Sequence, residues 1–233
     1  MRKNQSVFCG DPRPPASIMA YAKHIGAHLK KINHDFTCIG QSDSTFHWQG
    51  QQWLLTDLPK PPLVLSNIAV ALAILETLHQ RLPIPLAAIR TGLQQLDLPG
   101  RYQIVKHQGK TFINDVAHNP AAIKNLVTQL KKDWPHHSIH LIFGMMADKD
   151  WSTCFELLSQ LNLTHCYFPT VDDPRALTTE HLTTQCRIKN IPYQQSHSID
   201  AALDTACLQA LAEDIILVTG SFRLVGACIA YLK

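Results

Sequence analysis

From residue 98 onward, short runs rich in β-branched and aromatic residues alternate with longer amphipathic runs, and this alternation limits the fold more than any other feature. It predicts strands at 111–115, 139–143, 165–168 and 215–219, and helices at 121–132, 151–161, 177–188, 199–211 and 222–232. Strands that alternate with helices form an open, mostly parallel sheet with helices on both faces. The predicted class is therefore α/β, with a Rossmann-like sheet whose sites lie at the carboxyl ends of the strands.

Residues 1–98 have a less regular pattern. They predict a strand at 6–9, a helix at 17–25 that ends at Gly26, and a hairpin at 46–55. Further helices are expected at 66–75, with Ser66 as the N-cap, and at 86–96. The change in pattern predicts a domain boundary between residues 98 and 99.

Composition excludes several classes of protein. The net charge of +3 is spread over scattered Lys and Arg, without the basic stripe of a nucleic-acid binder. Seven widely spaced cysteines favour a reducing compartment over a disulfide framework or a zinc site. The start of the chain does not resemble a signal peptide, and the longest apolar run, 68–75, is too short for a membrane span. We expect a cytoplasmic protein whose partners include neither nucleic acid nor membrane.

Polar residues follow three of the predicted strands. Asp115 and His118 follow the first, ahead of Asn119 and Pro120, which suit the N-cap and the first turn of a helix. For Asp115 and His118, a functional site and a simple turn are equally good interpretations. The segment from Gly144 to Asp150 follows the next strand, and capping alone explains its acidic residues.

The third strand end carries Gly220 and Ser221 ahead of a helix. Backbone N–H groups at such a helix start can bind an anion, although capping alone also explains the serine. Arg101 follows Pro99 and Gly100 at the predicted boundary, where the turn could direct its guanidinium toward a phosphate or ribose.

In chain order, the motifs P-G-R-Y-Q-I-V, D-V-A-H-N-P, G-M-x-x-D-K-D and V-T-G-S-F resemble those of the folylpolyglutamate synthase/dihydrofolate synthase family, within the Mur ligase superfamily. The earlier segments 8–18 and 66–73 resemble that family as well, with Ser66 where proline is usual. Members of the family begin with an ATPase domain that carries a G-T-N-G-K-G-S phosphate loop. These 233 residues contain no G-x-x-x-x-G-K-[ST] arrangement.

The resemblance implies a role for each matching residue. Residues 1–98 would be an incomplete piece of the central ATPase domain, with Asn67 near adenine, and 99–233 the glutamate-ligase domain. Arg101 would reach the ATP phosphates and Asp115 would bind the nucleotide. His118 and Ser221 would lie near the acyl phosphate and the incoming glutamate. Arg223 receives no catalytic role, because many relatives have histidine there.

The implied reaction is ligation of L-glutamate to dihydropteroate or to the glutamate tail of a reduced folate, with ATP and Mg²⁺. The metal ligands are expected mainly outside these residues, with none assigned within them, and the chain alone is expected to be inactive. Two alternatives stay open: another amino-acid ligase of the superfamily, acting on cell-wall precursors, and a non-catalytic binding module or subunit of a split ligase.

Overall fold

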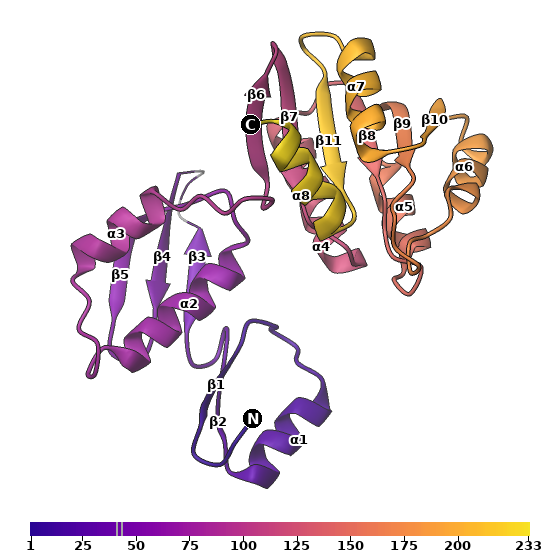
Figure 1. The fold of residues 1–233 in the computed structure, drawn as a ribbon. Coiled ribbons are helices and arrows are strands. Elements are labelled where there is room, and N and C mark those ends of the chain that lie inside the picture. Colours follow the sequence, from indigo (N-terminus) through magenta and orange to yellow (C-terminus); the bar gives the residue numbers. More distant parts are fainter. Residues whose placement is uncertain (41, 43) are drawn as a thin grey trace. The chain divides into compact units, whose positions relative to one another are not determined.

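The computed structural model describes residues 1–40, 42 and 44–233 and divides into two compact units, Met1–Leu96 and Asp97–Lys233 (Figure 1). The division predicted from the sequence, between residues 98 and 99, lies close to this one. None of the helices in the described part of the chain is long and apolar enough to cross a bilayer.

The first unit begins with a parallel pair of strands, β1 (Ser6–Cys9) and β2 (His28–Lys31), joined through helix α1 (Ala16–Ile25). Gly26 ends α1 in the left-handed region, at φ 70°, and its N–H donates to two carbonyl groups of the last turn. The predicted helix stop at Gly26 is therefore confirmed. All four residues of β1 remain half-buried, so this small sheet has only a thin core.

The rest of the first unit is an antiparallel sheet with two helices. Strands β3 (Thr37–Gly40), β4 (Thr45–Gln49) and β5 (Leu54–Pro59) are followed by α2 (Leu65–Leu78) and α3 (Leu86–Gln94). Alternate residues of the sheet face a core shared with α2, and Phe46 and Trp48 are completely buried in it. The predicted hairpin between residues 46 and 55 is confirmed.

The prediction that Ser66 caps α2 is wrong. The helix begins at Leu65, after Val64, and the N-cap has no side-chain hydrogen bond. The Val64 carbonyl accepts the N–H groups of Asn67 and Ile68 at 3.0 and 3.4 Å instead. An extended Val64 ahead of the first turn was enough to start the helix, so the serine became an ordinary second residue.

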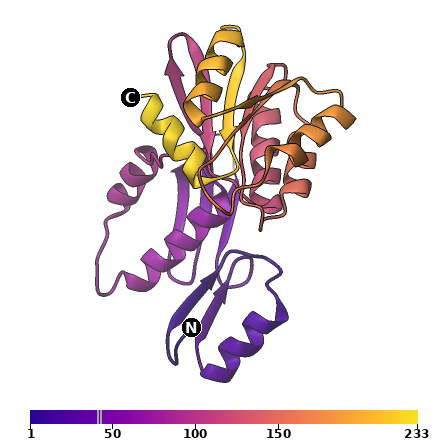
Figure 2. The same cartoon turned by 45° about the vertical axis from the view of Figure 1, so that its right-hand side comes forward.

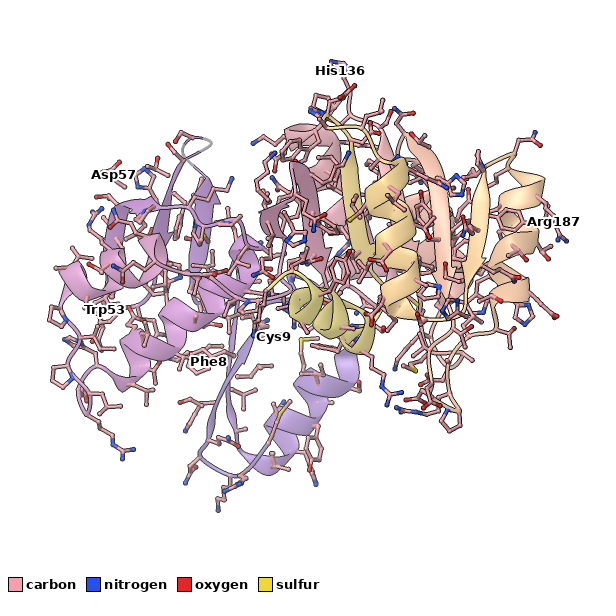
Figure 3. All side chains as sticks on the ribbon, turned by 45° about the horizontal axis from the view of Figure 1, so that its top comes forward. Phe8, Cys9, Trp53, Asp57, His136 and Arg187 are labelled. Atoms are coloured by element: carbon pink, nitrogen blue, oxygen red, sulfur yellow. The ribbon has the colours of Figure 1, made fainter. Side chains whose placement is uncertain are left out.

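A buried carboxylate on α2 holds the turn of the β4–β5 hairpin. Glu76 is 6% exposed and accepts the backbone N–H groups of Gln51, Gln52 and Trp53 at 2.7–3.2 Å. The ring of Trp53, labelled in Figure 3, lies edge-on to the rings of Trp48 and His79. This helix therefore fixes the hairpin by packing and by hydrogen bonds.

The second unit is a six-stranded sheet in the order β10-β9-β8-β11-β7-β6. Its elements in chain order are β6 (Gln103–His107), β7 (Lys110–Asp115), α4 (Pro120–Asp133), β8 (Ile139–Phe143), α5 (Trp151–Leu158), β9 (Leu163–Pro169), α6 (Thr179–Ile188), β10 (Tyr193–Ser196), α7 (Ile199–Gln209), β11 (Ile215–Thr219) and α8 (Phe222–Tyr231). All neighbouring strands pair in parallel except β6 with β7. The predicted α/β class and the mostly parallel sheet are confirmed.

Helices cover both faces of this sheet because its strands are apolar on both sides. On one face, Ile113, Leu141 and Leu217 pack against α4, α5 and α6. On the other face, Ile142 and Ile216 pack against α7 and α8. Figure 1 shows α7 and α8 in front of the sheet, and Figure 2 gives a turned view of the same layers.

Strands β6 and β10 were not predicted from the sequence. The β6–β7 hairpin turns through Gln108 and Gly109, both with positive φ, which is the geometry of a two-residue hairpin turn. The sequence signal was therefore present at Gln108-Gly109. Strand β10 is short and polar, so its pairing with β9 defines it more than its own composition does.

Candidate functional site

A cleft of about 340 Å³ opens at the carboxyl ends of the parallel strands in the second unit. It is lined by the segments that follow β7, β8, β9 and β11: His118, Met146, Lys149, Asp173, Arg175, Gly220, Ser221, Phe222 and Arg223. Loops that leave the same sheet edge converge there, as in other open α/β sheets.

Asp115, the last residue of β7, connects two backbone segments at this edge. One carboxylate oxygen accepts the N–H of Tyr102 at 2.8 Å, and the other accepts the N–H of Ala117 at 2.7 Å. Tyr102 has φ 45°, so this bond stabilises an uncommon backbone conformation next to Arg101. Burial raises the pKa of Asp115, although the two N–H donors and the Arg101 charge oppose the rise. The carboxylate thus has a structural function, and each oxygen retains a further lone pair.

His118 lies on the turn between β7 and α4, where Asn119 caps α4 by accepting the N–H of Ala122 at 2.9 Å. The His118 Nδ1 is 2.8 Å from the carbonyl oxygen of Val116. A carbonyl only accepts hydrogen bonds, so Nδ1 carries the hydrogen. The neutral ring then has its lone pair on Nε2, in a side chain that lines the cleft. His118 is therefore fixed in the tautomer that can accept a proton.

Gly220 and Ser221 form the turn from β11 into α8. Ser221 is 6% exposed, and its Oγ caps the helix by accepting the N–H of Leu224 at 3.2 Å. Its hydroxyl hydrogen remains available to a ligand. Gly220 has φ 112°, and an added Cβ would lie 2.6 Å from the Gly144 carbonyl oxygen. Only glycine fits this close approach of two loops.

The rim of the cleft is rich in cationic side chains. Lys149, Arg175 and Arg223 line it together with one carboxylate, Asp173. Asp173 lies 3.4 Å from Arg175 and 3.6 Å from Arg223, and the Arg175 backbone N–H and guanidinium lower its pKa. Arg223 also donates to the carbonyl oxygen of Asp172. Lys149 is paired with Asp148 at 3.3 Å, so Arg175 and Arg223 against the Asp173 carboxylate leave an excess of one cation, which suits an anionic ligand.

Three of the residues proposed from the sequence, Asn67, Arg101 and Asp115, lie outside the lining of the cleft. Arg101 is exposed in the second unit, where its guanidinium lies 5.3 Å from the centre of the Phe222 ring. Asn67 is an exposed residue of α2 in the first unit. Asp115 lies on the strand that leads to the cleft, whereas His118 and Ser221 both line it.

The sequence interpretation missed most of the cationic rim. The segment from Gly144 to Asp150 was expected to supply capping residues and a family motif but no site residue, Arg223 received no catalytic role, and Arg175 was not among the candidates. Asp150 does cap α5, by accepting the N–H of Thr153 at 3.2 Å. The signal that could have found Arg175 is the polar Asp172-Asp173-Pro174-Arg175 run, which begins three residues after the end of β9.

The fold defines an open α/β domain with a cleft at the carboxyl edge of a mostly parallel sheet. Residues 100–222 match the family model described as "Mur ligase, glutamate ligase domain". The chain belongs to this family.

The chain is 31% identical to the dihydrofolate synthase/folylpolyglutamate synthase of Escherichia coli (strain K12), over 97% of this chain and 51% of that protein. The solved structure of E. coli FolC in complex with DHPP and ADP is similar to 99% of this chain, with a TM-score of 0.88 and 30% identity, over 53% of its own length. A structure of a bifunctional folylpolyglutamate synthase/dihydrofolate synthase with Mn, AMPPNP and L-glutamate bound has a TM-score of 0.86 and 32% identity to this chain. The similarity covers 99% of this chain and 54% of that one. The chain therefore spans about half the length of the relatives it matches.

Proposed function

We propose that this chain is the C-terminal part of an ATP-dependent ligase that adds L-glutamate to dihydropteroate or to the glutamate tail of a folate. The observation that carries the proposal is the cationic cleft at the strand ends, lined by His118 and Ser221, in a chain of the Mur ligase glutamate-ligase family. Relatives with 30–32% identity have been solved with ADP and DHPP, or with AMPPNP, Mn and L-glutamate, which supports these substrates.

The proposed ligand of the cleft is L-glutamate, because its charge matches the rim. Glutamate carries two carboxylates and one ammonium group at neutral pH. Arg175 and Arg223 can donate to the carboxylates, since a guanidinium presents several N–H donors in a planar fork. Asp173 balances one of these two guanidinium charges and Asp148 balances Lys149, so the rim keeps a net positive charge.

The proposed chemistry is attack of the glutamate amine on an acyl phosphate. The ammonium group of glutamate first gives one proton to water and becomes the amine. The new C–N bond then forms, the C–O bond to phosphate breaks, and the attacking nitrogen loses a second proton. His118 Nε2 can accept this proton, because Nδ1–H is bound to the Val116 carbonyl. The Ser221 hydroxyl can donate to the oxyanion of the tetrahedral intermediate.

ATP would be bound through Arg101, Asn67 and Asp115 in this proposal. Within residues 1–40, 42 and 44–233, the structure contains no group of three or more His, Cys, Asp or Glu arranged for a metal ion. The proposal assigns no metal ligand within this chain and expects the ligands of the Mg²⁺ that accompanies ATP mainly at residues outside it. We also place the complete ligase in the cytoplasm, with partners limited to these small molecules.

The test is a pair of substitutions in the complete ligase. His118→Ala is expected to reduce kcat about 10²-fold at saturating ATP, because a positioned proton acceptor is lost. Asn119→Ala is the matched control: the helix cap is lost, at a cost of roughly 0.5–2 kcal/mol of stability, and the chemistry stays. Steady-state kinetics and thermal melts on both variants separate the two effects.

Equal kcat for wild type and His118→Ala would leave His118 as a turn residue and remove its catalytic role.

The 233-residue chain alone is expected to release no ADP with dihydropteroate or tetrahydrofolate, glutamate, ATP and Mg²⁺, because it contains no phosphate-binding loop. Glutamate incorporation by the pure chain would overturn this part.

A further inference from the structure

Phe222 is an exposed aromatic residue at the start of α8, and burial does not explain its position. Its side chain is 60% exposed, although it belongs to a helix whose Leu224 and Val225 are buried. Exposing a phenyl ring to water has a cost, since apolar surface is stabilised by leaving water. The contacts that the ring does make therefore indicate its function.

The ring contacts two of the residues proposed for the site. The Arg101 guanidinium carbon lies 5.3 Å from the ring centre, within the range of a cation–π contact. The His118 ring centre lies 5.5 Å away, with the two planes tilted by 51°. These three side chains come from separate segments: the turn before β6, the turn before α4, and the start of α8.

The backbone beside Arg101 is held firmly. Asp115 accepts the Tyr102 N–H, the Gly100 carbonyl accepts the Val116 N–H at 2.9 Å, and the Gln103 side chain accepts the Gly100 N–H at 3.1 Å. The α8 side is fixed as well, by the Ser221 cap. Both ends of the Arg101–Phe222 contact thus come from ordered backbone.

The guanidinium of Arg101 is not held by hydrogen bonds in the way that the backbone beside it is. Among the described residues it forms no direct hydrogen bond or ion pair, although its charge acts on the Asp115 carboxylate, and the Phe222 ring centre lies 5.3 Å away. A guanidinium has five N–H donors, and all of them remain available. A π face attracts a cation without accepting a conventional hydrogen bond, so the contact with the ring leaves these donors free.

We propose that Phe222 is a positioning residue, whose ring holds the Arg101 guanidinium beside His118 so that the free N–H donors can bind a phosphate group. The inference deepens the proposed function, since it assigns to Arg101 a prearranged contact with the nucleotide phosphates. It does not require turnover, so it can be examined on the 233-residue chain.

The first experiment measures the order of the Arg101 side chain without any ligand. Nitrogen-15 relaxation of its Nε–H group is expected to report a restrained side chain in wild type and in Phe222→Tyr. In Phe222→Leu, which keeps apolar bulk and removes the ring, the same group is expected to become mobile. Arg187, whose guanidinium lies 5.8 Å from the Tyr193 ring (Figure 3), serves as an internal reference that all three proteins share.

The second experiment is a double-mutant cycle with inorganic tripolyphosphate as the probe. Phe222→Leu is expected to weaken binding about two- to five-fold, the usual strength of an exposed cation–π contact. In an Arg101→Gln background the same substitution is expected to have no further effect, because the ring acts through the arginine. Arg187→Gln controls for the loss of one exposed charge.

The outcomes are separable. An Arg101 side chain that is equally mobile in wild type and Phe222→Leu overturns the positioning role, whatever the ligase does. Equal losses from Phe222→Leu with and without Arg101 also overturn it, since the ring would then act by another route. The proposed ligase activity is judged separately, by the kinetics of His118→Ala.

Discussion

Gly220 is the single residue on which the shape of the cleft depends most directly. Its φ of 112° lies in the region that favours glycine, and an added Cβ would meet the Gly144 carbonyl oxygen at 2.6 Å and the Phe143 ring at 2.8 Å. Gly220→Ala is therefore expected to lower the free energy of unfolding by roughly 1–3 kcal/mol or more. Chemical denaturation measures this loss.

Gly226 provides the matched control, because it lies on the adjoining helix α8 and an added Cβ there meets nothing within 4 Å. Gly226→Ala is expected to raise stability by about 0.5–1 kcal/mol, since alanine favours a helix. If both alanine variants changed stability in the same direction, the steric argument at Gly220 would fail.

His140 makes stability depend on pH. It is 3% exposed, with Nδ1 2.9 Å from the Tyr167 hydroxyl and Nε2 3.3 Å from Asp214. Burial lowers its pKa below the usual 6.5, and the Asp214 carboxylate opposes part of this effect while Lys110 adds to it. The pKa of the neighbouring His165 is lowered as well, by burial and by His140.

A histidine with a lowered pKa binds its proton more readily in the unfolded chain. The free energy of unfolding is therefore expected to fall as the pH drops through 6.5 toward the folded-state pKa. Urea denaturation across this pH range should show that the free energy of unfolding decreases. In His140→Gln the decrease over the same range should be smaller. His136→Gln, at an exposed residue labelled in Figure 3, is the control. Identical pH profiles for wild type and His140→Gln would contradict the prediction.

At the level of elements, the β4–β5 hairpin depends on a carboxylate from α2. Glu76→Gln replaces one acceptor oxygen by a donor that faces the backbone N–H groups of the turn. The free energy of unfolding is expected to fall by about 1–3 kcal/mol, because buried N–H donors are left without an acceptor. Hydrogen exchange at Gln52 and Trp53 should accelerate while amides of the second unit keep their rates.

Glu180→Gln, an equivalent change at an exposed residue in the first turn of α6, is the control for the charge itself. It is expected to leave hydrogen exchange in the hairpin unchanged. Unchanged exchange in Glu76→Gln would instead show that packing of Trp48 and Trp53 holds the turn without the carboxylate.

For the whole molecule, the two units are expected to differ in resistance to proteases. The residues of β1 are only half-buried, and the parallel β1–β2 pair is a sheet of two strands. Every residue of β8 and β11, in contrast, is buried. Limited trypsin digestion should therefore cleave within Met1–Leu96 first and leave a fragment close to Asp97–Lys233. Simultaneous loss of both units would contradict this.

The sequence by itself determined the layered α/β fold of residues 97–233. Short apolar runs rich in β-branched residues, such as Ile215–Thr219, favour strands buried on both faces, and the amphipathic runs between them favour helices that cover those faces. It also determined helix ends that depend on one residue, such as the Asn119 cap of α4, because such caps form through local hydrogen bonds. The local rule failed at Ser66, because the N-cap of the helix is the extended Val64, two residues earlier.

Only the tertiary structure decided which side chains meet. Arg101, His118 and Phe222 are far apart in sequence, and their contacts arise because three loops leave one sheet edge. The cationic rim depends in the same way on Lys149, Arg175 and Arg223 coming from separate loops. The polar strand β10 likewise exists through its pairing with β9. Local propensity carries no information on such long-range contacts, because they form only when the sheet brings distant segments together.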